Sequence, residues 1–457
     1  MADPGPIEAG PTGPSKPSKP LKPPKPPNPA FRMMGLPNIR LKLPSRNWMI
    51  FLSITGSWTA AVMYDRREKR RIQRKWAKVV DHIAVEPLDA QQLPRKLTVY
   101  LSAPPGDGLV PARDHFSEFV KPILVAAAVD WDAVEGRREG DVRAGLAERI
   151  RRLRMKNGEQ SREPLEVDEA MVRDDVRSRN GIREWDGIPG DIVIGRHTWK
   201  EYVRGLHEGW LGPMDPPPPP PIDELIIPAV AAVPAPSDSS PPSTSPTDDA
   251  SSSAVPEPEQ LKDEKPKEEE KPKKKTQPPA FNTTFDYSTS NVSPNCPTAL
   301  GPTAVVPQPH LLGFLNFPIR IYRFLNRRSV AEDVGRQTAA AVLAAYQPFD
   351  TTGGPDSSTA SDESQWEQQR LLQHEEAEWH KSVRERKDDD TRERIWLDDM
   401  VLDPRIAERM RKFVLTADDE ERAKRLTSEK DESWLASLWP KSEQKKKAWE
   451  GLSDDLD

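Results

Sequence analysis

The sequence predicts an α/β protein with one N-terminal transmembrane helix, followed by a parallel sheet covered by helices on both faces. Three observations lead to this fold class. Residues 47–64 form an uncharged run that ends abruptly at basic residues, as a membrane-spanning helix does. Strand-like and helix-like segments then alternate, which is typical of a parallel sheet. A stretch rich in proline, serine and charge, residues 213–280, interrupts this alternation without ending it.

Composition limits how much of the 457-residue chain can form a core. Fifty prolines and 31% charged residues, against 35% hydrophobic ones, leave long segments unable to offset their ordering entropy by burial. The 67 basic and 73 acidic residues nearly cancel, so no overall field favours nucleic acid. Cys296 is the only cysteine, which excludes a disulfide framework, and the seven histidines lack metal-ligand spacing. We therefore expect neither a metal nor a cofactor.

The N-terminal 64 residues divide into two parts. Residues 1–46 are basic and contain Pro-Lys repeats, which predicts a disordered, extended segment and not a presequence helix. Residues 47–64 would span about 27 Å as a helix, close to the thickness of a bilayer core. Trp48 and Tyr64 stand at its ends, where aromatic rings favour the membrane interface. A buried core helix is the alternative, and the basic flanks favour the transmembrane interpretation.

One side of this predicted membrane helix carries small residues. Ser53, Ser57 and Ala61 are spaced four apart, and Gly56 and Ala60 lie beside them. Small side chains let the backbone of a second membrane helix approach closely. The pattern predicts a helix-packing face; chance is the alternative, since small residues are common in membrane spans.

The soluble α/β part is predicted in two halves, residues 65–212 and 281–350, on either side of a disordered linker at 213–280. It begins with a basic helix, residues 66–85. The expected strands are β-branched or apolar runs, at residues 96–103, 131–135, 191–194 and 303–306. The expected helices carry apolar stripes, at residues 114–129, 141–153 (capped by Asp141), 198–206 and 330–346. This order predicts a Rossmann-like sheet that the last strand rejoins after the linker.

The first predicted strand ends in a turn that is the foremost candidate for a binding site. The turn contains Pro105, Gly106, Asp107 and Gly108. Ligands of parallel sheets bind at the carboxyl ends of the strands, and glycine lets backbone amides approach a phosphate. A single Gly-x-Gly pair is weak evidence, so a tight structural turn is the alternative interpretation.

Residues 309–328 (PHLLGFLNFPIRIYRFLNRR) mix aromatic and basic side chains. Such a mixture also occurs in proteins that bind single-stranded nucleic acid. Because the overall charge is close to neutral, we expect this stretch either to pack against the sheet or to contact a membrane surface.

The C-terminal region, residues 351–457, is densely charged and is expected to be partly helical. Ile406, Met410, Phe413 and Val414 form an apolar helical stripe, interpreted as a face that docks on the same chain. Six tryptophans in this polar region favour protein contacts, at Trp366, Trp379, Trp396, Trp434, Trp439 and Trp449.

Several long segments, among them LPRKLTVYLSAPPGDGL at residues 93–109, closely resemble the fungal Tim-fifty-four family. This family supplies a subunit to the carrier translocase of the mitochondrial inner membrane. The resemblance implies a non-catalytic, membrane-anchored subunit that supports insertion of multispanning, carrier-type precursor proteins. It implies as partners the channel-forming and other translocase subunits, small chaperones of the intermembrane space and inner-membrane lipid, but no nucleic acid.

The resemblance also implies a topology that charge leaves undecided. Residues 1–46 and 65–78 each hold eight Lys or Arg, so the distribution of basic residues favours neither orientation. The family implies a single-pass protein of the mitochondrial inner membrane, with its N-terminus in the matrix and its bulk in the intermembrane space.

A second, fainter resemblance is to the nucleotide-binding lobe of diacylglycerol and sphingosine kinases. In those enzymes a strand ends in Gly-Gly-Asp-Gly-Thr, where this chain reads Ile-Gly-Arg-His-Thr. Only Gly195, Thr198 and Glu201 fit the pattern, whereas Arg196 replaces the acidic residue and His197 the last glycine. The β-carbon of His197 blocks the close backbone approach that glycine allows. The resemblance thus implies a lipid-kinase-like fold with a degenerate phosphate loop, and a membrane-tethered lipid or nucleotide kinase is the alternative function.

Overall fold

The computed structural model describes residues 44–162, 169–217, 279–350, 366–379, 383 and 393–428. The chain forms two compact units, residues 1–61 and 62–457. The predictions for residues 1–43, for most of the 213–280 linker and for Trp434, Trp439 and Trp449 lie outside the described residues.

The first described helix is longer than either segment from which it was predicted. α2 covers Arg46–Val80 without interruption, so the uncharged run and the basic segment after it belong to one helix. Among the described residues, no helix is both long enough and apolar enough to cross a membrane. The transmembrane helix therefore stays a prediction. A short 3-10 turn, η1 (Ile83–Val85), follows α2.

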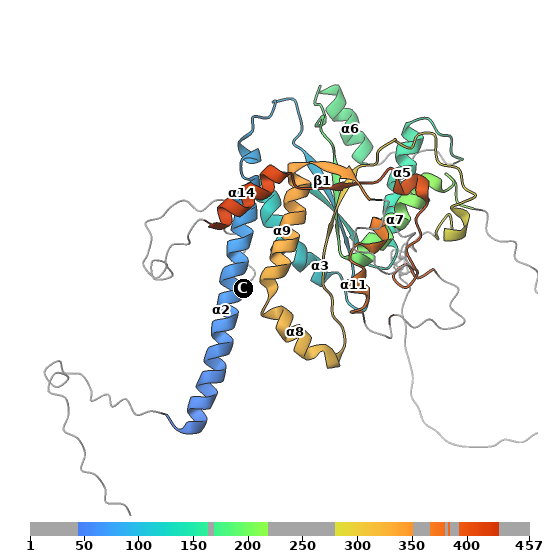
Figure 1. Cartoon of the computed structure of the whole chain (residues 1–457). Helices are drawn as coiled ribbons and strands as arrows, with labels where there is room; N and C mark the ends of the chain where they lie inside the picture. The colour runs from blue at the N-terminus through green and yellow to red at the C-terminus, as the bar shows by residue number, and fades with distance from the viewer. Residues whose placement is uncertain are drawn as a thin grey trace, which may run out of the picture. The chain divides into compact units, whose positions relative to one another are not determined.

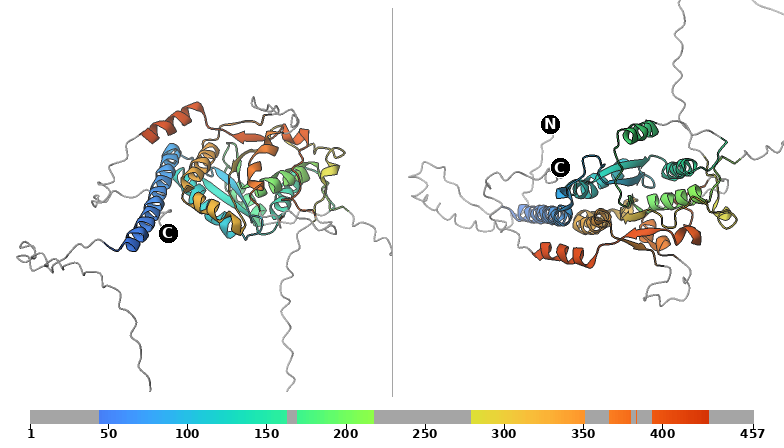
Figure 2. Two further views of the ribbon diagram at one scale, coloured as in Figure 1. Left: turned by 60° about the horizontal axis from the view of Figure 1, so that its bottom comes forward. Right: turned by 90° about the horizontal axis from the view of Figure 1, so that it is seen from above.

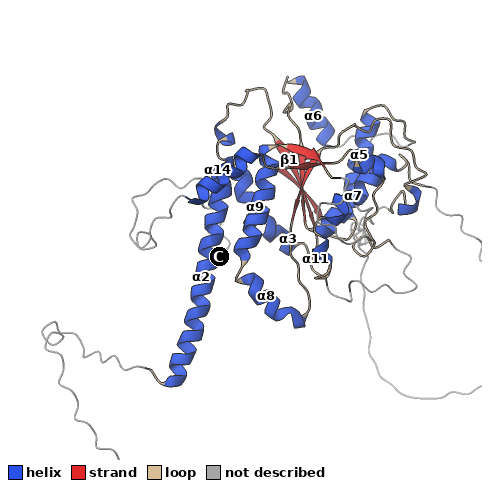
Figure 3. Ribbon diagram, viewed as in Figure 1, coloured by secondary structure: helices blue, strands red, loops and turns tan. Residues whose placement is uncertain are grey.

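Six strands form one sheet in the order β2-β1-β3-β4-β6-β5 (Figure 1, Figure 3). The strands are β1 (Lys96–Ser102), β2 (Asp130–Gly136), β3 (Gly190–Ile194), β4 (Pro302–Val306), β5 (Tyr346–Pro348) and β6 (Arg411–Phe413). Neighbouring strands are parallel, except that β5 is antiparallel to β6. The four predicted strands are confirmed, and β4 rejoins the sheet beside β3 as expected.

Side chains of the central strands alternate between two hydrophobic cores, one on each face of the sheet. In β1, Leu97, Val99 and Leu101 belong to one core, and Tyr100 belongs to the other. The alternation follows from the two-residue period of a strand. Both faces are buried, which explains why the strands read as nearly continuous apolar runs.

Two groups of helices cover these faces (Figure 1, Figure 2). The first face packs on the end of α2 and on α3 (Val110–His115), the π-helical turn η2 (Phe116–Val120), α4 (Lys121–Ala126) and α9 (Arg327–Leu343). The second packs on α5 (Asp141–Lys156) and α7 (Arg196–Leu211). Every residue of α7 is buried, although several are charged. Those charges therefore require partners inside the protein.

The prediction that Asp141 caps α5 is wrong. The N-cap is Gly140, whose φ of +86° favours glycine. The Asp141 carboxylate instead accepts hydrogen bonds from the backbone N–H groups of Arg137 and Arg138, at 3.0 and 2.8 Å. It thus stabilises the turn before the helix.

The apolar stripe at residues 406–414 does not lie on one helix, contrary to prediction. Ile406 lies in a single turn, α13 (Pro404–Ala407), and Phe413 lies in strand β6. The residues after α13 leave the helix because Arg411 and Lys412 pair with β4, so sheet pairing overrides the helical periodicity. Ile406 and Phe413 are buried, which confirms the expected docking on the same chain.

The remaining elements are short or lie outside the sheet layers. They are α6 (Glu169–Arg179), η3 (Thr284–Asp286), η4 (Phe314–Asn316), α8 (Phe317–Phe324), α10 (Glu367–Arg370), α11 (Gln373–Glu376) and α14 (Ala417–Ser428). Most of the described helices of the C-terminal region are single turns.

Candidate functional site

The two predicted phosphate-loop segments lie at the carboxyl ends of the adjacent strands β1 and β3. In the turn after β1, the Asp107 N–H donates to the Pro104 carbonyl oxygen at 3.1 Å. Gly106 has a φ of +86°, and a Cβ added there would lie 2.9 Å from Leu312 Cδ1. The positive φ of the turn therefore favours glycine at position 106. Of the other positions, Pro105 is buried and Gly108 is exposed.

Gly195 connects β3 to α7 in a conformation that glycine favours. Its φ and ψ are +86° and 153°, and its N–H donates to the Val306 carbonyl oxygen at 2.9 Å. A Cβ at this position would lie 2.6 Å from His197 Cε1. The His197 ring therefore occupies the space beside Gly195 that a close backbone approach by a phosphate would need.

A carboxylate of the same chain occupies the N-terminus of α7. Glu375 Oε2 accepts a hydrogen bond from the Arg196 N–H at 2.9 Å, and Oε1 accepts one from the Gln308 N–H at 2.8 Å. A helix N-terminus with free amides is a common anion site. Here the Arg196 amide, which would bind a phosphate, already binds Glu375, whose side chain is buried.

The two buried cations at the start of α7 are also held within the chain. Arg196 Nε donates to Glu376 Oε1 at 2.6 Å, and Nη1 donates to the Leu371 carbonyl oxygen at 2.8 Å. Lys200 Nζ lies 3.1 Å from the same Glu376 oxygen and donates to the Trp396 carbonyl oxygen at 3.0 Å. Segments of the C-terminal region therefore close this edge of the sheet.

The polar groups beneath this edge do not form a nucleophile–base pair. Ser102 Oγ donates to Glu201 Oε1 at 3.0 Å, while His197 Nε2 lies 3.0 Å from the Ser102 carbonyl oxygen. An activating histidine would bond the hydroxyl and not the carbonyl. Ser102 has no exposed surface, and the buried Thr198 hydroxyl has no hydrogen-bond partner among the described residues.

Burial shifts the ionisation of these groups towards their neutral forms. It raises the pKa of Glu201 to about 7 and that of Glu375 to about 7. It lowers the pKa of His197 to about 4. The direction is the one expected when an ionisable group loses its hydration. Hydrogen bonds from Trp396 Nε1 and from the Val142 N–H stabilise the Glu201 carboxylate in part.

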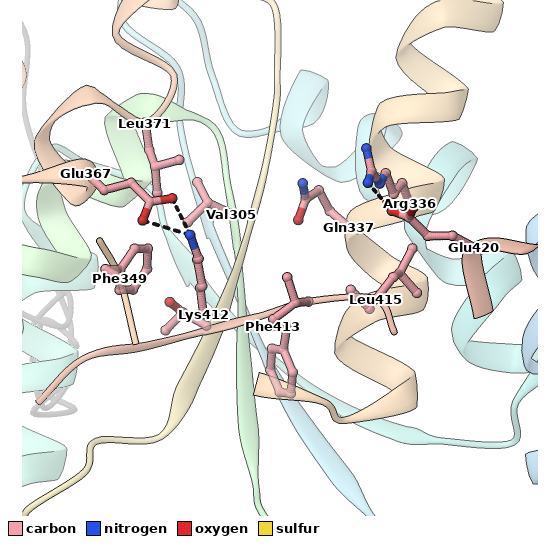
Figure 4. A pocket seen from close by; sticks show the side chains of 13 residues that line it. Val305, Arg336, Gln337, Phe349, Glu367, Leu371, Lys412, Phe413, Leu415 and Glu420 are labelled. Carbon is pink, nitrogen blue, oxygen red and sulfur yellow. Dashed lines mark hydrogen bonds and ion pairs between the residues drawn. The ribbon is translucent and has the colours of Figure 1, made fainter. Parts of the chain in front are cut away.

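A pocket of about 290 Å³ lies elsewhere, between β4, β6, α9 and α14 (Figure 4). β4 and β6, which contribute to its lining, pair with each other over only two residues. Its charged side chains form two ion pairs, Glu367 with Lys412 and Arg336 with Glu420. None of the phosphate-loop positions predicted from the sequence lines this pocket. The sequence does not predict it because the residues of β6 were expected in a helix.

The predicted packing face lies on α2. Ser53, Gly56, Ser57 and Ala60 are exposed, and Ala61 is half-exposed. The hydroxyls of both serines donate to carbonyl oxygens one turn earlier, at 2.8 and 2.9 Å. This leaves the side of the helix without free hydroxyl donors.

Comparison with known proteins identifies the family. A family model described as "Inner membrane protein import complex subunit Tim54" matches residues 28–413. Mitochondrial import inner membrane translocase subunit tim54 of Neurospora crassa is 50% identical over 423 residues, which cover 89% of this chain and 85% of that protein. The Aspergillus oryzae protein of the same name is 49% identical over 406 residues, with 86% and 89% covered. The chain therefore belongs to the Tim54 family of inner membrane protein import complex subunits.

Proposed function

We propose that this chain is a non-catalytic, membrane-anchored subunit of the mitochondrial inner-membrane translocase that inserts carrier-type proteins. The family match over residues 28–413 is the observation that supports this proposal most strongly. The relatives from Neurospora crassa and Aspergillus oryzae are named as subunits of the mitochondrial import inner membrane translocase. As such a subunit, the chain would dock small chaperones of the intermembrane space and stabilise the channel-forming and other subunits.

The proposed anchor is the first half of α2. Large apolar side chains are exposed along it, namely Trp48, Met49, Ile50, Phe51, Leu52, Ile54, Trp58, Met63 and Tyr64. Exposed apolar surface on this scale is costly in water and favourable in a bilayer. The face of Ser53, Gly56 and Ala60 would allow a helix of another subunit to approach closely. We place the N-terminus in the matrix and the sheet domain in the intermembrane space.

The contacts around α7 support a non-catalytic role over the kinase alternative. A kinase needs glycine amides against the phosphates and an acidic residue for the metal or the nucleophile. Here Glu375 binds the Arg196 amide, and the His197 ring fills the space beside Gly195. Binding of ATP at this site would require Glu375 to break its hydrogen bond with the Arg196 N–H.

Import into isolated mitochondria tests the transport role. Depletion of the chain should lower insertion of a carrier-type precursor, while import of a matrix precursor with a presequence stays near normal. Re-expression of the full chain is the control and should restore insertion. An equal loss of both routes would point to a general membrane defect and contradict the proposal.

Extraction and protease accessibility test the anchor and its orientation. The chain should resist carbonate extraction. External protease should degrade everything after Arg66 once the outer membrane is opened and the inner membrane is intact. Protection of the C-terminal region would reverse the proposed orientation, and extraction into the soluble fraction would exclude the anchor.

Nucleotide binding tests the kinase alternative. Calorimetry on the full chain in detergent should detect no magnesium-dependent ATP binding at about 1 mM, where sites of roughly −4 kcal/mol would still appear. Saturable binding that Gly106→Val abolishes would instead support a kinase.

A further inference from the structure

The segment between β4 and α9 exposes an unusual number of large apolar side chains. Phe314 and Leu315 are each 91% exposed, and no residue of α8 is buried. The exposed set within η4 and α8 is Phe314, Leu315, Phe317, Ile319, Tyr322 and Phe324. The alternative in which α8 packs into the sheet is therefore wrong. Figure 1 shows α8 beyond the end of α9 and apart from the sheet.

Basic and apolar side chains lie on different sides of α8. Arg320 and Arg323 are three residues apart in α8, which places them on one side of the helix. Arg323 pairs with Glu378, and Arg320 is exposed. The rest of the circumference of α8 is aliphatic or aromatic. No aspartate or glutamate occurs between Pro307 and Ala331. A basic stripe beside a broad aromatic and aliphatic face is typical of helices that lie in the interface of a membrane.

Contacts fix the start of α9, which follows α8 after a two-residue turn, to the point where the uncharged run of α2 ends. The Arg328 N–H donates to Asp65 Oδ1 at 3.3 Å, and the Arg328 guanidinium lies 5.1 Å from the centre of the Tyr64 ring. Glu118 binds Arg327 at 2.6 Å and Lys69 of α2 at 2.7 Å. The end of α8 that leads into α9 therefore lies near the residues at which α2 would leave the bilayer.

We propose that η4–α8 (Phe314–Phe324) lies in the interface of the inner membrane, with its apolar face among lipid chains and the exposed Arg320 towards anionic headgroups. The inference rests on the proposed anchoring of the chain through α2. A lipid surface fits better than a second protein because aromatic and arginine side chains both favour the headgroup region. Arg320 is exposed, so positive charge is presented beside the apolar face of α8.

This second contact would fix the orientation of the sheet domain against the membrane. A single helix lets a domain rotate and tilt. A contact at η4–α8, which leads into the start of α9 that Glu118 connects to α2, would add a second point of attachment. The surface of the domain that faces away from the bilayer would then always be presented to soluble partners.

Spin labels on single cysteines of the full chain provide the test. In a Cys296→Ser background, Phe314→Cys and Phe317→Cys place labels on the proposed membrane face, and Ile54→Cys reports the anchor. Phe285→Cys is the matched control, because Phe285 is 89% exposed on η3. Each variant is reconstituted in phosphatidylcholine vesicles containing about one-fifth anionic cardiolipin. Paramagnetic relaxation then compares access of oxygen, which favours lipid, with access of a water-soluble nickel chelate.

Labels at 314 and 317 should favour oxygen severalfold over the label at 285, at a depth of roughly 5–10 Å. A water-exposed label at 314 together with a buried label at 54 would overturn this inference and leave the anchor intact. A water-exposed label at 54 would overturn the anchor. If the label at 314 is accessible to the nickel chelate in vesicles but inaccessible in the intact translocase, the segment is a protein-docking surface. That result would contradict the proposal that it contacts lipid.

Discussion

The carboxyl-end edge of the sheet buries charged side chains, whereas the η4–α8 segment exposes apolar ones. At the sheet edge, Arg196, Lys200 and Glu375 are buried, and each is bound by groups of the same chain. In η4–α8, the large apolar side chains face outward, and none of α8 is buried. At the sheet edge, the chain itself supplies the partners of the buried charges. In η4–α8, the described chain does not cover the exposed apolar side chains, so another molecule or a bilayer would have to do so.

This difference shows where interaction with other molecules is to be sought. A parallel sheet of this kind binds ligands at its carboxyl edge when loop amides stay free. Here the amide at the start of α7 is bound to Glu375, and the Gly195 amide is bound to Val306. Exposed aromatic side chains, by contrast, gain free energy when a partner or bilayer covers them. We therefore place the contacts of this subunit on its exposed apolar segments.

Removal of the Glu375 carboxylate tests whether the edge is closed by that residue. Glu375→Ala leaves the buried N–H groups of Arg196 and Gln308 without acceptors, which should lower the free energy of unfolding by about 2–4 kcal/mol. Urea unfolding of the full chain in detergent, followed by tryptophan fluorescence, measures the change. The control is Glu421→Ala on α14, since Glu421 forms an exposed i,i+4 pair with Arg425. That variant should lose less than about 0.5 kcal/mol, and equal losses in the two variants would contradict the comparison.

A lower pH should reduce the stability of the folded chain, because His197 is buried in its neutral form. Its pKa lies near 4 in the folded chain because burial opposes protonation, against about 6.5 in the unfolded chain. Between these values the unfolded state binds a proton that the folded state does not, so stability falls as pH decreases from 6.5 to 4. The full loss is about 3 kcal/mol at 1.36 kcal/mol per pKa unit.

His197→Gln keeps a donor for the Ser102 carbonyl oxygen but does not titrate. Glu201 and Glu375 have raised pKa values and change stability in the opposite sense, yet they remain in both proteins. The difference between variant and parent therefore isolates His197. The variant should lose less stability between pH 6.5 and 4. Parallel pH profiles would show that His197 is not buried in its neutral form.

Gly195 offers a smaller test of the same edge. Gly195→Ala places a Cβ 2.6 Å from the His197 ring and requires a backbone conformation that is nearly restricted to glycine. We expect a loss of roughly 2–3 kcal/mol in urea unfolding. Gly145→Ala is the matched control, because nothing lies within 4 Å of an added Cβ in the middle of α5. That control should gain up to about 1 kcal/mol. If Gly195→Ala is as stable as its parent, the His197 ring and the neighbouring backbone can move to admit the added Cβ, which would contradict a closed edge.

The sequence predicts the sheet well because β1, β3 and β4 contain apolar or β-branched runs and helical segments separate the strands. It fails for β5 and β6, which have three residues each and gain their structure only from pairing. The helical stripe at Ile406 and Phe413 was misassigned for the same reason. At the candidate site, the sequence gives the positions of Gly106 and Gly195 at the strand ends. It cannot indicate Glu375, since one glutamate in a charged region carries no local signal for a partner 179 residues away.

The last prediction concerns the open segment, where the expected effect on folding is smallest. Phe314→Ser combined with Leu315→Ser removes two large apolar side chains that are 91% exposed, so urea unfolding in detergent should change by less than about 0.5 kcal/mol. Phe119→Ser is the control, because Phe119 is buried in η2 and its replacement should cost about 3–5 kcal/mol. The same double variant in vesicles should nevertheless expose a label at Phe317→Cys to the nickel chelate. A large loss of stability would mean that Phe314 and Leu315 pack within the chain, and the contrast between the closed and the open region would then fail.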